Sequence, residues 1–234
     1  MRRLEKALGA LSVPAYWPAL ARGVVPGTEH GSAFVGREFS TVLDVGANKG
    51  QFAAFAAHRW PHATLTCFEP LSGPRNRLSA IMGEKARIHP VALGNYEGEA
   101  VMHVASREDS SSLLPLGDAQ KTLFSMDEDH VLPVPVRRLD KVVERKHLSA
   151  PTLLKIDVQG LEFETLQGST GLLDLIDAVY VECSFVELYA GQKLAVDVAQ
   201  ILHDFELEET GRFNICRRGN TEVQADLLFE RGNP

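Results

Sequence analysis

Short apolar runs alternate along most of the chain with stretches whose apolar residues recur at helical spacing. The apolar runs predict strands at residues 41–45, 64–68, 87–93, 99–105, 134–139, 152–156 and 178–183. The helical spacing predicts helices at residues 51–59, 74–82, 161–168 and 195–203, and a short one ending near residue 147. Because right-handed crossovers join strands that alternate with helices, the pattern predicts an α/β fold with a mostly parallel sheet and helices on both faces. Two last strands, 205–210 and 223–230, are predicted to form an antiparallel pair.

The first 40 residues lack this regular alternation. Leu4, Leu8 and Leu11 have helical spacing, which predicts a short amphipathic helix. We interpret residues 1–40 as an N-terminal helical extension that packs over the domain edge or forms a lid. Residues 41–234 are then one α/β domain, which the length of the chain allows.

Composition narrows the classes of function. The 234 residues are 44% hydrophobic and 24% charged, which is typical of a globular protein. A net charge of -7 without a Lys/Arg cluster argues against nucleic acid as a partner. The three cysteines are widely spaced and show no metal-ligand pattern, so neither a disulfide framework nor a zinc site is expected. No apolar run approaches the ~20 residues of a membrane span. We expect a cytoplasmic protein, and its oligomeric state, a homo-oligomer included, stays open.

The first two predicted strands end in residues suited to a nucleoside. Parallel α/β sheets bind ligands beyond the carboxyl ends of their strands. The first strand runs into the turn Asp44-Val45-Gly46-Ala47-Asn48-Lys49-Gly50-Gln51. Its glycines permit a tight turn, and the next helix offers free N–H groups. Glu69 follows the second strand and could accept two hydrogen bonds from a ribose diol.

The turn favours S-adenosylmethionine over a dinucleotide. The G-x-G-x-x-G pattern would need glycine at positions 46, 48 and 51, and only Gly46 matches. S-adenosylmethionine carries no pyrophosphate, and Asp44 could orient the ammonium of its amino-acid tail. The closing antiparallel pair also suits a methyltransferase. A nicotinamide-dependent oxidoreductase is the rival enzyme, and a binding module without catalytic activity is the rival from another class.

Two further acids lie at the ends of later strands. Asp157 follows strand 152–156 and could deprotonate a hydroxyl, ligate a metal or hold the cofactor, or it could cap the next helix. Glu182 lies in an apolar strand, where an acid is costly unless it is paired. It is therefore either a site residue or half of an ion pair, for which Lys155 is the candidate partner. If Asp157 and Glu182 both coordinated Mg²⁺, the ion would acidify a hydroxyl.

Residues 106–130 are polar, rich in serine and without a period, which predicts a long functional loop. Ser110, Ser111 and Ser112 could donate hydrogen bonds to a ligand there, although a solvated loop is the simpler interpretation. His30 could reach a ligand only if the N-terminal extension folds over the site.

Taken in order, these motifs resemble the FkbM-type S-adenosylmethionine-dependent methyltransferases. The matching pieces are Val42-Leu43-Asp44-Val45-Gly46-Ala47-Asn48-Lys49-Gly50-Gln51-Phe52, Phe68-Glu69-Pro70, Val91-Ala92-Leu93-Gly94, Ser111-Ser112-Leu113-Leu114, Arg138-Leu139-Asp140, Leu154-Lys155-Ile156-Asp157-Val158-Gln159-Gly160, Val181-Glu182-Cys183-Ser184-Phe185 and Gln224-Ala225-Asp226-Leu227-Leu228-Phe229. The resemblance covers roughly residues 25–230.

The resemblance implies a class I methyltransferase (Rossmann-like) fold with seven strands, and methyl transfer usually to an oxygen. It implies a sugar hydroxyl or a secondary metabolite as acceptor. The residues expected to contact S-adenosylmethionine are Asp44, Gly46, Ala47, Asn48, Gly50, Gln51, Glu69, Pro70, Ala92, Ser111 and Asp157. Asp157 and then Glu182 are the candidate catalytic residues, and the resemblance leaves the base open.

Overall fold

The computed structural model describes residues 9–232, and its strands form two sheets. The larger sheet contains β1 (Thr41–Val45), β2 (Thr64–Phe68), β3 (Ala86–His89), β7 (Thr152–Ile156), β8 (Ala178–Ser184), β9 (Leu207–Arg218) and β10 (Thr221–Arg231). The smaller sheet contains β4 (Ala92–Leu93), β5 (Gly98–Ala105) and β6 (Glu128–Arg137). The α-helices are α2 (Trp17–Leu20), α3 (Gln51–Arg59), α4 (Ser72–Met82), α5 (Asp118–Phe124), α6 (Leu139–Val142), α7 (Glu162–Gln167) and α8 (Ala195–His203). Short 3₁₀ helices are η1 (Pro14–Tyr16), η2 (Thr28–Phe34), η3 (Gly83–Lys85), η4 (Glu108–Ser110), η5 (Arg145–His147) and η6 (Leu173–Leu175).

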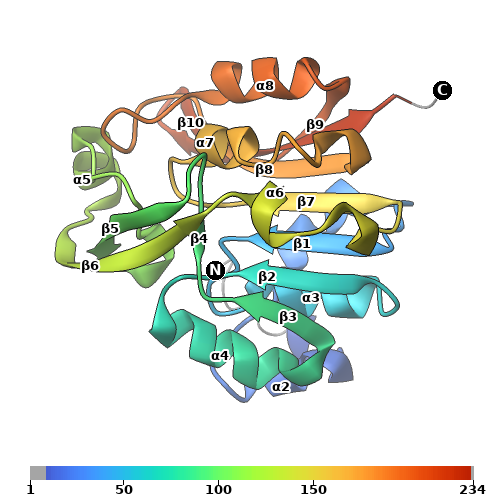
Figure 1. The fold of residues 1–234 in the computed structure, drawn as a ribbon. Helices are drawn as coiled ribbons and strands as arrows, with labels where there is room; N and C mark the ends of the chain where they lie inside the picture. Colours follow the sequence, from blue (N-terminus) through green and yellow to red (C-terminus); the bar gives the residue numbers. More distant parts are fainter. Residues whose placement is uncertain (1–8, 233–234) are drawn as a thin grey trace.

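The larger sheet has the strand order β3-β2-β1-β7-β8-β10-β9 (Figure 1). Neighbouring strands from β3 to β8 are parallel, whereas β10 is antiparallel to both β8 and β9. The predicted parallel sheet with an antiparallel C-terminal pair is therefore confirmed. The strand order reverses between β1 and β7, which is where ligands of such sheets bind.

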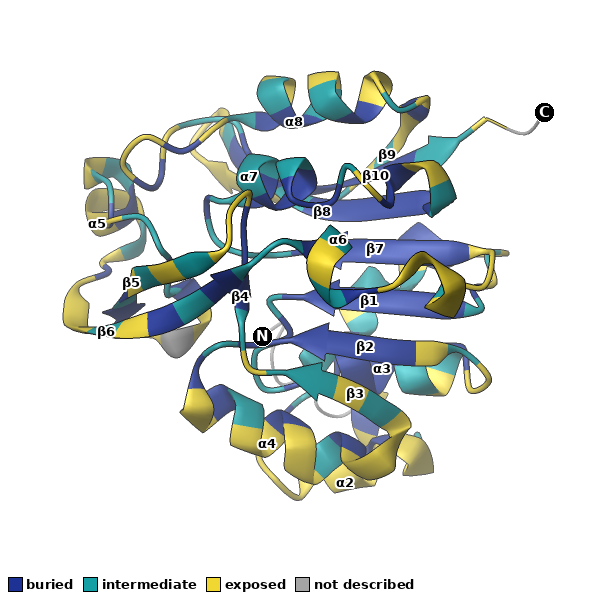
Figure 2. Cartoon of the chain, in the orientation of Figure 1, coloured by how far each residue is buried: buried dark blue, intermediate teal, exposed yellow. Residues whose placement is uncertain are grey.

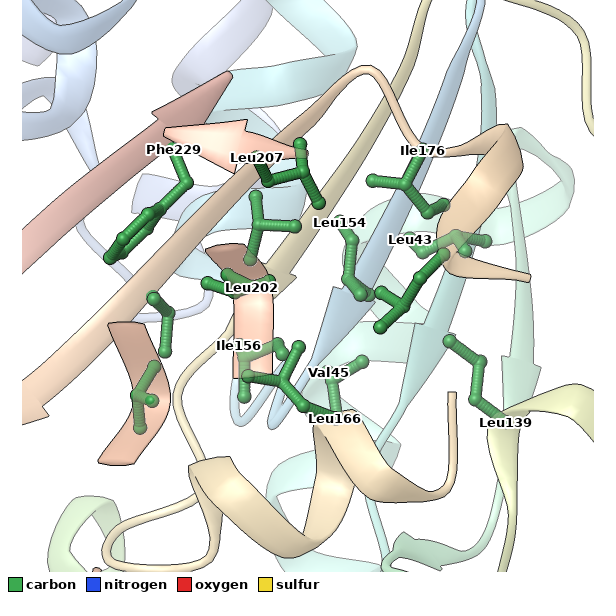
Figure 3. Close-up of a cluster of buried hydrophobic side chains, with 14 of the residues drawn as sticks. Leu43, Val45, Leu139, Leu154, Ile156, Leu166, Ile176, Leu202, Leu207 and Phe229 are labelled. Atoms are coloured by element: carbon green, nitrogen blue, oxygen red, sulfur yellow. The ribbon is translucent and has the colours of Figure 1, made fainter. Parts of the chain in front are cut away.

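Alternating side chains of the central strands supply the cores on the two faces of this sheet. Leu43 and Val45 point into one core and Val42 into the other, as the two-residue period of a strand requires. The first core contains buried residues of α7 and α8, some of which are shown in Figure 3. The second core contains the buried face of α3. Strands β1 and β7 are buried along their length, and β8 is buried except at Glu182 (Figure 2), which explains why they are nearly continuous apolar runs in the sequence.

The prediction of one strand over 87–93 is wrong. β3 ends at His89, and β4 begins at Ala92 in the other sheet, where it pairs with β6. Pro90 lies between them, and its missing N–H prevents a continuous ladder.

The prediction of a long loop over 106–130 is also wrong. The segment contains η4 and α5, and from Glu128 it belongs to β6. β6 runs antiparallel to β5, and the smaller sheet lies beyond the carboxyl ends of the parallel strands (Figure 1). The segment therefore adds a structured wall above the sheet edge.

The N-terminal segment is described only from Gly9, so Leu4 and Leu8 of the predicted helix lie outside the described residues. Downstream, η2 places Phe34 in the core beside α3. Arg37 donates two hydrogen bonds to the Glu230 carboxylate on β10, of 2.6 and 2.5 Å, which fastens this segment to the sheet. Among residues 9–232, no helix is long and apolar enough to cross a membrane.

Candidate active site

A cavity of about 1190 Å³ opens at the carboxyl ends of β1, β2 and β7. Its walls come from the turn after β1, the ends of β2 and β7, the first half of β10, the smaller sheet, α5 and the segment before η2. The cavity therefore lies where strand order reverses, between the two sheets.

The turn after β1 approaches the end of β7 so closely that only glycine fits at position 46. Gly46 has φ +73°, and a Cβ added there would lie 1.8 Å from the Asp157 carbonyl oxygen. The Gly46 and Ala47 N–H groups donate to the Phe68 carbonyl at 3.1 and 3.0 Å. Gly50, with φ +90°, is the N-cap residue just before α3. The backbone conformation and the close approach of neighbouring atoms therefore explain why glycine occupies these two positions.

Glu69 is held at the end of β2 by two backbone donors. Its carboxylate accepts hydrogen bonds from the Asn48 N–H at 2.9 Å and the Leu71 N–H at 2.8 Å. Burial nevertheless raises the pKa of Glu69 to about 7, because these bonds and the charges of Lys155 and Arg75 offset only part of the desolvation. The carboxylate lines the cavity and retains lone pairs for further donors.

Asp44 does not line the cavity. Its carboxylate is buried beneath the turn, with Lys155 Nζ 3.0 Å from Oδ1. Lys155 also donates to the Gly46 carbonyl at 3.2 Å, so the ion pair supports the turn from below. Lys155 was the candidate partner if Glu182 formed an ion pair, and that alternative is wrong because the lysine is paired with Asp44 instead.

The two candidate catalytic carboxylates are joined through an amide. Gln159 Nε2 donates to Asp157 Oδ1 at 2.7 Å and to Glu182 Oε2 at 2.6 Å. Gln224 Nε2 donates to the same Glu182 oxygen at 2.7 Å. Burial, followed by repulsion from Asp157 and Asp226, raises the pKa of Glu182 well above its ordinary value. Glu182 therefore holds its proton more tightly than an ordinary glutamate, whereas the Asp157 side chain is 39% exposed.

Gln159 itself is fixed by hydrogen bonds from the opposite wall. It adopts φ +57°, a left-handed conformation that costs a non-glycine residue energy. The Tyr189 hydroxyl donates to its Oε1 at 2.7 Å, and the Ser112 hydroxyl donates to its carbonyl at 2.6 Å. Gln120 Nε2 of α5 donates to the Tyr189 hydroxyl at 3.1 Å.

The serine segment is part of this network rather than a solvated loop. Ser110 and Ser112 are buried, and the Ser111 hydroxyl accepts the Ala105 N–H at 3.2 Å while lining the cavity. The interpretation of the segment as solvated is therefore wrong for these three residues.

His30 enters the site because the N-terminal segment folds back over the sheet. Its Nδ1 lies 3.1 Å from the Tyr180 hydroxyl and 3.4 Å from Asp226 Oδ2. Its ring contacts Phe52 of α3 edge to face, with centroids 5.4 Å apart. The N-terminal extension thus folds over the site, as His30 requires in order to reach a ligand.

Most of the expected site residues share this one cavity. Those that line it are Gly46, Ala47, Asn48, Gln51, Glu69, Pro70, Ala92, Ser111, Asp157 and Glu182. Asp44 and Gly50 lie behind the wall. Sequence reasoning missed Gln159, Tyr189 and Gln224. Gln159 and Gln224 lie in motifs that carry the family resemblance, but neutral side chains give no local signal of a buried partner.

The described residues contain no group of three or more His, Cys, Asp or Glu side chains arranged to hold a metal ion. Between Asp157 and Glu182 lies the Gln159 amide, a donor where a cation would require acceptors. This geometry does not support the Mg²⁺ ion considered for these two acids.

Known proteins resemble this chain over most of its length. The family model described as the methyltransferase FkbM domain matches residues 44–210. The 2-O-methyltransferase NoeI of Sinorhizobium fredii is 29% identical over 175 residues, which are 71% of this chain and 72% of the relative. Methyltransferase 1 of Beauveria bassiana is 30% identical over 161 residues, covering 61% of this chain and 64% of the relative.

A solved structure supports the fold. The crystal structure of a methyltransferase FkbM from Methylobacillus flagellatus superposes with a TM-score of 0.53 at 14% identity. The match covers 81% of this chain and 43% of that chain, so this chain spans less than half of the longer protein. At this identity the similarity shows the architecture alone.

Proposed function

Since this chain belongs to the FkbM methyltransferase family, we propose that it transfers the methyl group of S-adenosylmethionine to a hydroxyl oxygen of a small molecule or saccharide. One observation carries the proposal. The glycine turn, Glu69 and Asp157 converge on one cavity, in a segment that the family model spans. The name of NoeI, a 2-O-methyltransferase, supports oxygen as the acceptor atom.

The walls of the cavity fit the parts of this methyl donor. Glu69 would accept the two hydroxyls of the ribose, and Pro70 and Ala92 would flank the adenine. The turn from Gly46 to Asn48 brings backbone close to the ligand, and Gln51 lies at the amino end of α3. When bound, the donor supplies a sulfonium methyl group, and Ser111 would close the site above it.

Asp157 is proposed to act at the methyl-transfer end. Its carboxylate lines the cavity beside the turn, and Gln159 fixes Oδ1. A negative charge there would stabilise the cationic donor. Glu182 would hold Gln159 and Gln224 in place, since its Oε2 accepts a hydrogen bond from each amide.

The first experiment titrates S-adenosylhomocysteine into the protein by calorimetry. Glu69→Gln removes a charged acceptor worth about 1.5–3 kcal/mol, so we expect roughly tenfold to hundredfold weaker binding at pH 8. The carboxylate form binds the ribose, and the pKa of free Glu69 is about 7, so wild-type affinity should rise between pH 6 and 8. Glu69→Gln should lose that rise.

Glu84→Gln, at an exposed glutamate, is the matched control and should bind like the wild type. Binding of NAD without binding of S-adenosylhomocysteine would favour a nicotinamide-dependent oxidoreductase and overturn the proposal. Binding of neither would support a module without catalysis.

The second experiment changes Asp157→Asn, which preserves size and removes the charge. We expect weaker binding of the cationic S-adenosylmethionine by about tenfold, with a smaller effect on neutral-sulfur S-adenosylhomocysteine. The comparison of the two ligands by calorimetry isolates the charge. Equal losses, or none, would contradict the electrostatic role of Asp157.

A further inference from the structure

His30 and Asp226 form a buried pair that the cofactor-binding half of the site does not use. His30 lies on η2, and Asp226 lies on β10 next to Glu182 of β8. Both side chains line the cavity, at 18% and 11% exposure. Two segments far apart in the sequence thus bring an imidazole and a carboxylate together at the edge where an acceptor would enter.

The partners of the ring are arranged around Nδ1. The Tyr180 hydroxyl lies 3.1 Å from Nδ1 and donates to Asp226 Oδ2 at 2.7 Å. Asp226 Oδ2 itself lies 3.4 Å from Nδ1. Asn214 Nδ2 of β9 donates to the same carboxylate oxygen at 2.7 Å. Asn214 Nδ2 also lies 3.4 Å from Nδ1, but its shorter contact is the hydrogen bond to Asp226. The two oxygens near Nδ1 therefore favour the tautomer with the proton on Nδ1 and the lone pair on Nε2.

The carboxylate behind the ring is kept ionised. Burial alone would raise the pKa of Asp226, but the hydrogen bond and charge of His30 and the donors Asn214 and Tyr180 outweigh it and lower the pKa. Burial and the neighbouring Asp226 charge raise the pKa of Tyr180, so Tyr180 stays a neutral donor. A fixed anion near Nδ1 orients the ring.

One more carboxylate faces the ring, at its other nitrogen. Glu29 of the same helix has Oε1 3.9 Å from Nε2 and is itself more exposed. Helix α3 contributes the aromatic rings of Phe52 and Phe55. Lys155, beyond Phe52, is already paired with Asp44. The ionised partner at hydrogen-bonding range is therefore Asp226.

The other acids of the site are poorly placed to accept a proton. Glu182 is held by Gln159 and Gln224, and Asp157 is bound by Gln159 and lies 3.9 Å from the Lys155 ammonium. Both carboxyl groups thus already accept hydrogen bonds from the protein. An alcohol needs a base to become an effective nucleophile, and histidine is the common one near neutral pH.

We propose that His30, oriented by Asp226 and Tyr180, is the general base that deprotonates the acceptor hydroxyl. This rests on the proposed function. The hydroxyl oxygen forms a bond to the methyl carbon, and the carbon–sulfur bond breaks with its electron pair going to sulfur. The hydroxyl proton moves to His30 Nε2, and the imidazolium later releases it to solvent. Asp226 and Tyr180 are positioning residues, since they act through the ring.

The experiment measures transfer of tritiated methyl from S-adenosylmethionine to a panel of p-nitrophenyl monosaccharides, together with binding of S-adenosylhomocysteine. His30→Gln should lower kcat by about a hundredfold or more and change the Kd by less than about threefold. The wild-type rate should rise with pH and then level, and His30→Gln should lose the rise. Asp226→Asn should lower kcat by about tenfold or more.

His58→Gln is the matched control, because His58 is an exposed histidine of α3. A structural role for His30 would lower stability and ligand binding, whereas the base role lowers kcat alone. His30→Gln with wild-type kcat would overturn the inference while leaving the proposed function intact. Failure of the wild type to bind S-adenosylhomocysteine would instead refute the proposed function.

Nitrogen NMR of the histidine ring provides a test that needs no acceptor. In the wild type at pH 8 the proton should reside on Nδ1 of His30, and Nε2 should be the unprotonated nitrogen. Asp226→Asn should lower the fraction of the ring that carries its proton on Nδ1. A proton on Nε2 in the wild type would overturn the proposal, and this result decides it even if no monosaccharide is methylated.

Discussion

At the scale of single residues, the site depends on backbone positions as much as on charged groups. Gly46 combines a left-handed backbone with a carbonyl that would lie 1.8 Å from any Cβ. The motif around it was visible in the sequence, but its contact with Asp157 was not. The glycine is required by the neighbouring strand as well as by the ligand.

Gly46→Ala should therefore destabilise the protein more than the unfavourable left-handed backbone conformation of alanine would alone. We expect a loss of about 3 kcal/mol in the free energy of unfolding, since strain and overlap add. Binding of S-adenosylhomocysteine should be lost as the turn moves. Urea unfolding and calorimetry measure the two effects.

Gly36→Ala is the matched control for this prediction. Gly36 has φ +74°, and a Cβ there would meet no atom within 4 Å. Its cost should be about 1–2 kcal/mol, from the left-handed conformation alone. Equal losses in the two variants would show that the contact with Asp157 does not matter.

At the scale of elements, the loop after β7 is held by hydrogen bonds from other parts of the chain. Tyr189 links Gln159 of this loop to Gln120 of α5. Gly160 must be small because a Cβ there would lie 3.0 Å from the Tyr189 ring. The loop conformation is thus decided by its neighbours.

Tyr189→Phe tests this dependence. Loss of the hydroxyl leaves polar groups of Gln159 and Gln120 buried without their partner, so we expect a loss of about 1–3 kcal/mol in stability. Methyl transfer should fall further than the binding of S-adenosylhomocysteine, because Gln159 positions both carboxylates. Tyr96→Phe, at a tyrosine that is 45% exposed, should leave all three measurements unchanged. Unchanged transfer in Tyr189→Phe would contradict the role of the network.

At the scale of the whole molecule, the cavity lies between two sheets that short chain segments connect. The parallel sheet supplies the turn, Glu69 and Asp157, and the smaller sheet with α5 supplies the opposite wall. A ligand that contacts both walls should stabilise the folded protein and reduce the mobility of α5.

Saturating S-adenosylhomocysteine should raise the melting temperature. At a hundred times its Kd, linkage gives about 2.7 kcal/mol, or roughly 5–10 °C for a protein of this size. Hydrogen exchange should slow in the turn after β1 and in α5. Glu69→Gln should show a smaller shift at the same ligand concentration. Slower exchange in the turn without any change in α5 would show that the ligand does not reach the second wall.

Elements with a strong local pattern could be predicted closely. The bounds expected for β1, α3, β2, β7 and α8 match those observed. Apolar strands and helical spacing are local signals, so these elements need no knowledge of the rest of the chain. The prediction for residues 106–130 was wrong because the helix and the strand edge in this region are polar. They are stabilised by packing against β5 and Tyr189, which the local sequence does not show.

The sequence by itself determined the α/β architecture, the glycine turn and the acids at the ends of the strands, because periodicity and strand-end position are written in neighbouring residues. The tertiary structure alone decided how deeply those acids are buried and what they touch. It paired Lys155 with Asp44, buried Glu182 beside other acids, and brought His30 to Asp226 across most of the chain. Burial and pairing depend on distances between remote segments, so no local pattern could reveal them.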